Sequence, residues 1–212
     1  MIKLIALDLD GTLLDSSGVI SDDNRSAIRA AEELGVLVTV ATGRRFRDAR
    51  PVALEIGFNA PIVTHNGALL KNAETLETVH ASLLDTATTV EVIRVGAEFG
   101  GDALLSSDPR GSGSLLYGRI SEDNFPLQKY IAWAARVHKG SDDGSAVVQV
   151  TDLAEAAAAT EIVHVSFSGH CAPMSELKHV LGEALGDKVN ILSTIYPEKD
   201  FTLLDVLPSE AS

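Results

Sequence analysis

The sequence contains a single cysteine, Cys171, and few aromatic residues, which make up 5% of its 212 residues. One cysteine excludes a disulfide within the chain, so an apolar core and not covalent cross-links must hold the fold. We interpret Cys171 as a small packed side chain and not as a nucleophile. No histidine and asparagine pattern typical of a cysteine hydrolase accompanies it.

Long apolar runs are also missing, because no stretch reaches the roughly 20 residues that a membrane-spanning helix needs. No signal peptide precedes the first strand, so we expect a cytoplasmic protein without a membrane partner. Positive charge is scarce, with 17 Lys and Arg against 30 Asp and Glu and a formal net charge of -13. This balance argues against non-specific nucleic-acid binding, which depends on Lys and Arg against phosphate. An anionic substrate would need a local positive centre.

The most informative stretch is the apolar run Leu4–Leu7, which continues into two carboxylates, Asp8 and Asp10. The run predicts a buried strand, and strand residues two apart share a face if the strand stays extended. Both carboxylates would then lie at the carboxyl end of a strand, where open α/β sheets bind ligands. Two like charges there repel unless a cation or a proton lies between them. A hard cation such as Mg²⁺ suits oxygen ligands and a phosphate partner.

Other interpretations of these residues are simpler. An Asp-x-Asp at the end of a strand can be a solvated turn, and calcium-binding loops begin with the same letters. The calcium loop does not fit, because Leu13 replaces its required Gly and Val19 replaces its terminal Glu. Thr42-Gly43, taken alone, could be a helix N-cap. Its interest comes from its place after a second apolar strand.

The first part of the chain alternates strands and helices. We expect Ser21 to cap the first helix, Gly35 to stop it and Gly57 to end the second. The strands are expected over 3–8, 36–41 and 61–64, and the helices over 22–34 and 46–56. This βαβαβ order with short loops implies a parallel sheet.

After about Ser82 the pattern changes to an α+β arrangement. The glycines between 108 and 114 join two strands and open no helix, so they are not a dinucleotide-binding loop. The expected helices cover 86–99, 125–138, 152–159 and 173–185, and the expected strands cover 103–106, 115–119, 146–150, 162–168, 189–195 and 201–206.

Three short motifs carry a resemblance that covers the whole chain. They are Asp8-Leu9-Asp10-Gly11-Thr12, Val40-Ala41-Thr42-Gly43-Arg44 and Thr64-His65-Asn66-Gly67-Ala68. Their order and spacing resemble the haloacid dehalogenase superfamily of phosphotransferases, and in particular its Cof-like branch with a type IIB cap. The resemblance implies an α/β fold, in which a Rossmann-like parallel sheet core carries an inserted α+β cap domain.

The same resemblance implies a Mg²⁺-dependent phosphatase, a hydrolase acting on phosphoric monoesters. It assigns the nucleophile to Asp8, which would form an aspartyl-phosphate, and the general acid and base to Asp10. Asp8 and Asp10 would also hold the metal. The phosphate-binding residues that it implies are Leu9, Thr42, Gly43, Arg44 and Asn66. The expected partner is a small phosphorylated metabolite such as a sugar phosphate, and the protein would be a monomer or a homodimer.

The resemblance also implies a division into domains. Residues 1–82 and 207–212 would form the phosphatase core, and residues 83–206 would form the cap. In the family, a lysine of a third motif and an aspartate pair of a fourth follow the phrase that ends at Ser212. We therefore expect a truncated chain, inactive by itself. A phosphomutase of the same superfamily and a non-catalytic phosphometabolite-binding module remain as alternatives.

Overall fold

The computed structural model describes residues 2–138 and 145–211, and the chain divides into two compact units, Met1–Ala81 and Ser82–Ser212. The boundary coincides with the change of pattern that the sequence shows near Ser82. No helix among the described residues is both long enough and apolar enough to cross a membrane. Each unit has its own apolar core and is described separately below.

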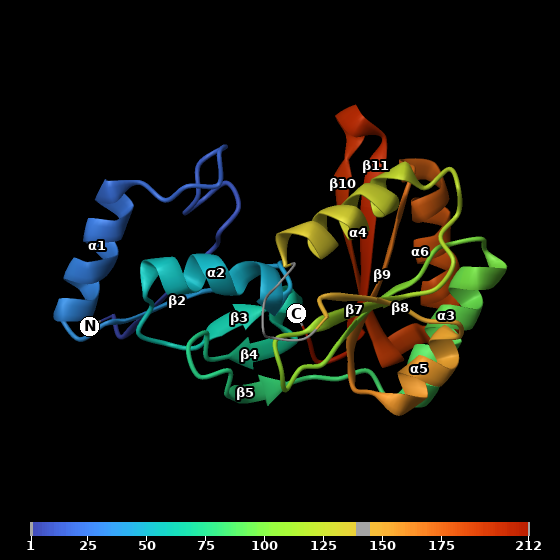
Figure 1. Ribbon diagram of the computed structural model, residues 1–212, viewed down its shortest axis with the longest axis horizontal. Coiled ribbons are helices and arrows are strands. Elements are labelled where there is room, and N and C mark those ends of the chain that lie inside the picture. The colour runs from blue at the N-terminus through green and yellow to red at the C-terminus, as the bar shows by residue number, and fades with distance from the viewer. Residues whose placement is uncertain (1, 139–144, 212) are drawn as a thin grey trace. The chain divides into compact units, whose positions relative to one another are not determined.

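The first unit is built on a short parallel sheet (Figure 1). Its elements are β1 (Leu4–Leu7), α1 (Asp22–Glu33), β2 (Leu37–Val40), α2 (Phe46–Ile56), β3 (Ile62–Thr64), β4 (Leu69–Lys71) and β5 (Thr78–Ala81). β1 pairs with β2 in parallel, with Leu4 opposite Leu37, and a parallel bridge from Ala41 to Val63 brings β3 beside them. β3, β4 and β5 then form an antiparallel meander. This hairpin extension was not predicted from the sequence.

Local signals in the sequence account for the two helices of this unit. The Ser21 side chain accepts a hydrogen bond from the Asn24 N–H at 3.2 Å, which satisfies one of the free donors at the start of α1. α2 ends at Gly57, whose φ of 77° is left-handed and suits glycine. Pro51 lies inside α2 without ending it. Apolar side chains on one face of α2, among them Phe46 and Ala53, pack into the core of the unit.

The second unit is a six-stranded sheet with helices on both faces (Figure 1). The strand order is β10-β11-β9-β6-β7-β8, and only the pairing of β7 with β8 is parallel. Its strands are β6 (Leu104–Ser107), β7 (Ser114–Tyr117), β8 (Val147–Gln149), β9 (Ile162–Gly169), β10 (Val189–Tyr196) and β11 (Phe201–Pro208), and its helices are α3 (Thr86–Glu98), α4 (Phe125–Val137), α5 (Leu153–Ala159) and α6 (Cys171–Leu185). The mostly antiparallel sheet is the α+β arrangement expected after Ser82, and the parallel sheet of the first unit confirms the α/β fold class.

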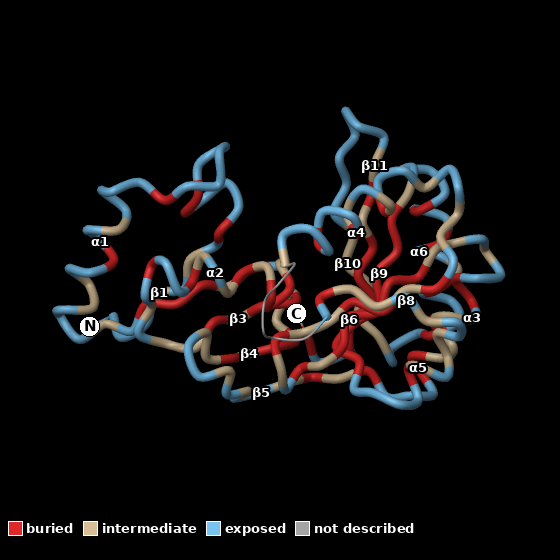
Figure 2. The backbone as a smooth tube through the Cα atoms, in the orientation of Figure 1, coloured by how far each residue is buried: buried red, intermediate tan, exposed pale blue. Residues whose placement is uncertain are grey.

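The two faces of this sheet bury separate apolar clusters. α3, α5 and α6 pack on one face around Phe167 and Leu204, whereas α4 packs on the other face against Leu104 and Leu115. The central strands β6 and β9 are buried along nearly their whole length (Figure 2). Apolar packing on both faces therefore stabilises the sheet of this unit.

Two details differ from the sequence predictions. Residues 207–212 were assigned to the first unit, but Leu207 and Pro208 continue β11 and pair with β10, since the apolar run of that strand does not stop at Val206. Cys171 is half-buried and less enclosed than predicted. It begins α6, where its backbone N–H donates a hydrogen bond to the Asp200 carboxylate at 3.0 Å.

Two helix glycines of the second unit allow a matched test of packing. A Cβ atom at Gly96 in α3 would lie 2.3 Å and 2.4 Å from ring atoms of Phe167, whereas one at Gly182 in α6 would meet nothing within 4 Å. Overpacking costs about 1–3 kcal/mol, and replacing a helix glycine with alanine gains up to about 1 kcal/mol. We expect Gly96→Ala to be destabilising and Gly182→Ala to be neutral or stabilising.

The measurement is denaturant unfolding of both variants beside the wild type, followed by the fluorescence of Trp133, the only tryptophan, which lies in α4. A Gly96→Ala protein at least as stable as Gly182→Ala would show that α3 does not approach Phe167 as closely as described.

Candidate active site

The first candidate residues follow β1 directly. The strand ends at Leu7, one residue before the end predicted from the sequence, because the chain turns back on itself. The Leu13 N–H donates to the Asp8 carbonyl at 3.2 Å, and the Leu14 N–H donates to the Leu9 carbonyl at 2.9 Å. Leu9 is fully buried, while Asp8 and Asp10 on either side of it are exposed. Exposed and buried residues therefore continue to alternate just after the strand, and both carboxylates are accessible to solvent.

The second group of candidate residues follows β2. The Ala41 N–H donates to the Leu7 carbonyl at 2.8 Å, and the Thr42 N–H donates to the Val63 carbonyl at 3.0 Å. These bonds tie the end of β2 to the ends of both neighbouring strands. Thr42 is 6% exposed, and its hydroxyl oxygen accepts a hydrogen bond from the Arg44 N–H at 3.2 Å. Thr42 and Arg44 are thus fixed in a tight turn beside β1.

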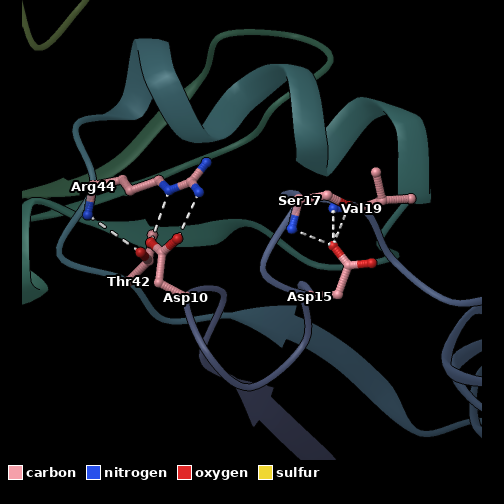
Figure 3. A network of polar contacts seen from close by, with 6 residues as sticks. All are labelled: Asp10, Asp15, Ser17, Val19, Thr42 and Arg44. Atoms are coloured by element: carbon pink, nitrogen blue, oxygen red, sulfur yellow. Dashed lines mark hydrogen bonds and ion pairs between the residues drawn. The ribbon is translucent and has the colours of Figure 1, made fainter.

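A two-point ion pair joins the first group to the second (Figure 3). Arg44 Nε lies 2.8 Å from Asp10 Oδ2, and Arg44 Nη2 lies 2.6 Å from Asp10 Oδ1. The hydrogen bond with Asp10 raises the pKa of the Arg44 guanidinium, and the charge of Asp8 raises it further. Arg44 is therefore a permanent positive charge beside two carboxylates. The side chains of Arg44 and Asp10 are 31% and 60% exposed, and such accessible pairs contribute about 1 kcal/mol or less. The pair can open at little cost.

The third group follows β3 in a turn with unusual backbone angles. His65, Asn66 and Gly67 have φ values of 54°, 52° and 93°, a region that residues other than glycine rarely adopt. This turn brings Asn66 to the second group, because a Cβ atom at Gly43 would lie 2.6 Å from Asn66 Oδ1. Position 43 therefore requires glycine as long as Asn66 keeps its place.

The connection between β1 and α1 is ordered by Asp15 (Figure 3). Asp15 Oδ1 accepts hydrogen bonds from the Ser17 N–H at 2.8 Å, the Ser17 hydroxyl at 2.6 Å and the Val19 N–H at 3.0 Å. The Ser17 hydroxyl makes the largest contribution to lowering the pKa of the Asp15 carboxyl. Ile20 is buried in the core of the unit. The hydrogen bonds to Asp15 therefore order the tip of this polar segment, and the burial of Ile20 fixes its end.

The structure thus brings together candidate residues from three separate parts of the sequence. Two further arginines, Arg110 and Arg119, lie in the second unit. Arg110 pairs there with Glu161 at 3.3 Å. The sequence did not predict that His65 contacts the turn after β2. The position of His65 directly before the candidate residue Asn66 was the one feature that could have suggested this contact. Within residues 2–138 and 145–211, no three His, Cys, Asp or Glu side chains converge on a point that would hold a metal ion.

Comparisons with known proteins agree with this arrangement. The model of the haloacid dehalogenase-like hydrolase family matches residues 5–131. The chain is 48% identical over 67 residues to 5-amino-6-(5-phospho-D-ribitylamino)uracil phosphatase YcsE of Bacillus subtilis, a match that covers 32% of this chain and 27% of that protein. It is 40% identical over 72 residues to phosphatase YwpJ of the same organism, covering 34% of this chain and 25% of the relative. The matched segment thus spans about a quarter of the length of these curated relatives.

Solved structures show the same fold over the whole chain. TM0651 from Thermotoga maritima superposes with a TM-score of 0.74 at 21% identity, covering 100% of this chain and 71% of that one. The subclass IIB sugar phosphatase BT4131 superposes with a TM-score of 0.69 at 18% identity, covering 99% of this chain and 71% of that one. Because the family model matches more than half of the residues, the chain belongs to the haloacid dehalogenase-like hydrolase family.

Proposed function

We propose that this chain provides the nucleophile and the phosphate-binding turn of a phosphatase that hydrolyses phosphomonoesters through an aspartyl-phosphate on Asp8. The observation that carries the proposal is the two-point pair between Asp10 and Arg44, which joins the ends of two parallel strands beside the exposed Asp8. A nucleophile, an acid–base group and a cation for phosphate are the parts that phosphoryl transfer needs.

In the proposed reaction, an Asp8 oxygen attacks the phosphorus in line and the ester oxygen leaves. Asp10 in its protonated form gives its proton to the leaving oxygen. Asp10 then takes a proton from a water molecule, which attacks the phosphorus of the aspartyl-phosphate. Inorganic phosphate leaves, and the Asp8 carboxylate and the protonated Asp10 are restored.

The turn after β2 is suited to holding the phosphate. The Thr42 oxygen already accepts the Arg44 N–H, so its own O–H is left to donate to a phosphate oxygen. We propose the backbone amides of Leu9 and Gly43, the Arg44 guanidinium and the Asn66 amide as the other donors. Donors fixed in advance stabilise charge as it develops in the transition state.

The end of β1 also offers Mg²⁺ fitting oxygen donors, which are an oxygen of the Asp8 carboxylate and the backbone carbonyl of Asp10. This ion prefers six oxygen ligands and takes one or two carboxylates together with phosphate oxygens and water. Asp8 and Asp10 would hold it, and it would supply positive charge against the phosphoryl group. The fit rests on the exposed Asp8 carboxylate and on Asp10, two positions further along the chain, just after β1.

We further propose that the first unit is the catalytic core and the second the cap. A sugar phosphate or a related small phosphorylated metabolite is the proposed substrate. It is supported by two similar proteins, one a phosphatase of a phosphoribityl compound and one a sugar phosphatase. A monomer or a homodimer remains the expected state.

The test is a phosphate-release assay of the native polypeptide. A panel of sugar phosphates and other phosphomonoesters is offered with Mg²⁺, with excess chelator and with Ca²⁺ in place of Mg²⁺. We expect release with Mg²⁺, loss of release on chelation and poor recovery with Ca²⁺, which prefers more ligands at longer distances.

Undiminished release in excess chelator would rule out the metal part of the proposal. A rearranged phosphate ester without inorganic phosphate would instead indicate a mutase. Binding of phosphomonoesters by the native polypeptide without any turnover would identify a binding module and contradict the hydrolase.

A further inference from the structure

We infer that His65 is a positioning residue for the phosphate-binding turn, defined here as residues 42–46. It would hold this turn in place from the far side of the site, by two hydrogen bonds that come from the connection between β3 and β4. The inference rests on the proposed function for the role of the turn. The contacts themselves are independent of that function.

Two hydrogen bonds run between His65 and the turn, and they lie on either side of Arg45. The His65 N–H donates to the Arg44 carbonyl at 2.9 Å, and the Phe46 N–H donates to His65 Nε2 at 3.0 Å. His65 is 3% exposed and Phe46 is 1% exposed. Water therefore cannot readily replace either bond.

The second bond satisfies a need of α2. Phe46 is the first residue of this helix, and the first N–H groups of a helix have no partner within it. The residue before it, Arg45, makes no side-chain cap. His65 supplies an acceptor from a different part of the chain and fixes the point where the turn becomes helix.

The first bond acts on the backbone of Arg44, the residue that pairs with Asp10. The left-handed backbone at His65 and Asn66 sends the two side chains to the same turn. His65 contacts its helical end, and Asn66 lies against Gly43. A strained backbone of this kind persists where the surroundings require it. The turn is thus held at two points by two neighbouring residues.

The bond to Phe46 also assigns the imidazole. A backbone N–H can only donate, so Nε2 must carry the lone pair and cannot carry a proton. This requirement defines which replacements should preserve the function. Glutamine has an amide oxygen that can accept the same bond, whereas leucine has a similar bulk and no acceptor.

The experiment uses His65→Leu and His65→Gln in the 212-residue chain, with His179→Leu as a matched control on α6, an exposed histidine of the second unit. Amide spectra and hydrogen exchange report on Phe46, Thr42 and Gly43, and inorganic phosphate is titrated as the probe. A lost buried hydrogen bond corresponds to roughly tenfold or more in an equilibrium constant. We expect His65→Leu to speed exchange at Phe46 and weaken phosphate binding by about that factor, and His65→Gln to restore both.

Faster exchange at Phe46 with unchanged Thr42 and Gly43 signals and unchanged phosphate affinity would overturn the inference, because His65 would then only cap α2. A wild-type chain whose Thr42 and Gly43 amides do not respond to phosphate would contradict the proposed function. Even in that case, the chemical shifts of the Thr42 and Gly43 amides without phosphate, compared between the wild type and the His65 variants, decide whether His65 positions the turn. If His65→Leu does not fold, the nitrogen signals of His65 in the wild-type chain decide, since a protonated Nε2 would exclude the bond to Phe46.

Discussion

Replacing Asp8 with Asn is expected to abolish phosphate-ester turnover while the fold survives. An amide has nearly the shape of a carboxylate but is a poor nucleophile, so the first chemical step is lost. Asp8 is exposed after the end of β1, and its replacement disturbs no buried group. We expect a loss of at least about a thousandfold, which corresponds to about 4 kcal/mol in the activation barrier. Phosphate release by the native polypeptide measures it, and circular dichroism checks the fold.

Asp187→Asn is the matched control, because Asp187 is an exposed aspartate in a 3₁₀ turn of the second unit. It should leave turnover unchanged. A rapid acid quench followed by mass spectrometry should find a phosphoryl group on the wild-type chain and none on Asp8→Asn. Turnover of Asp8→Asn within about tenfold of wild type, only about 1.4 kcal/mol in the barrier, would remove Asp8 from the role of nucleophile.

Replacing Phe167 with Ala should be the most damaging core change in the second unit. The ring is 1% exposed on β9 and fills the space that two glycines leave open, Gly96 of α3 and Gly101 just after that helix. Truncating a buried phenylalanine costs about 3–5 kcal/mol, because the transfer energy is lost and a cavity remains. Denaturant unfolding followed by Trp133 fluorescence measures the loss.

Phe125→Ala provides the comparison, since Phe125 begins α4 with 62% of its surface exposed. Surface substitutions of this kind usually change stability by no more than about 0.5 kcal/mol. Phe167→Leu keeps most of the volume and should cost less than about 1.5 kcal/mol. A cost of Phe167→Ala close to that of Phe125→Ala would mean that the sheet and α3 do not enclose the ring.

Most elements of the fold were predictable because their signals are local. Apolar periodicity located β2, α2 and the strands of the second unit within about two residues, and Ser21 and Gly57 marked the ends of helices as expected. The β4 and β5 hairpin was missed because its strands are short. One of them ends on Lys71, which is fully buried although its residue type suggests the surface.

The candidate site was only partly predictable. The motif residues could be named, because each follows an apolar strand in a recognisable phrase. Their contacts could not, because these join residues far apart in the chain. The pair of Asp10 with Arg44 and the bond from Phe46 to His65 form only after the strands have aligned. The local sequence does not show which distant residues will become partners.

At the proposed site, the ion pair between Asp10 and Arg44 would couple the binding of an anion to the binding of a cation. An anion that draws Arg44 away would leave the Asp10 carboxylate near Asp8 without its counter-ion, which is unfavourable. A cation bound beside Asp10 would in turn compete with the guanidinium for the negative charge that now pairs with it. When both ions arrive together, every charge regains a partner. We therefore expect the affinity for each ion to rise in the presence of the other, and by linkage the two increases are equal.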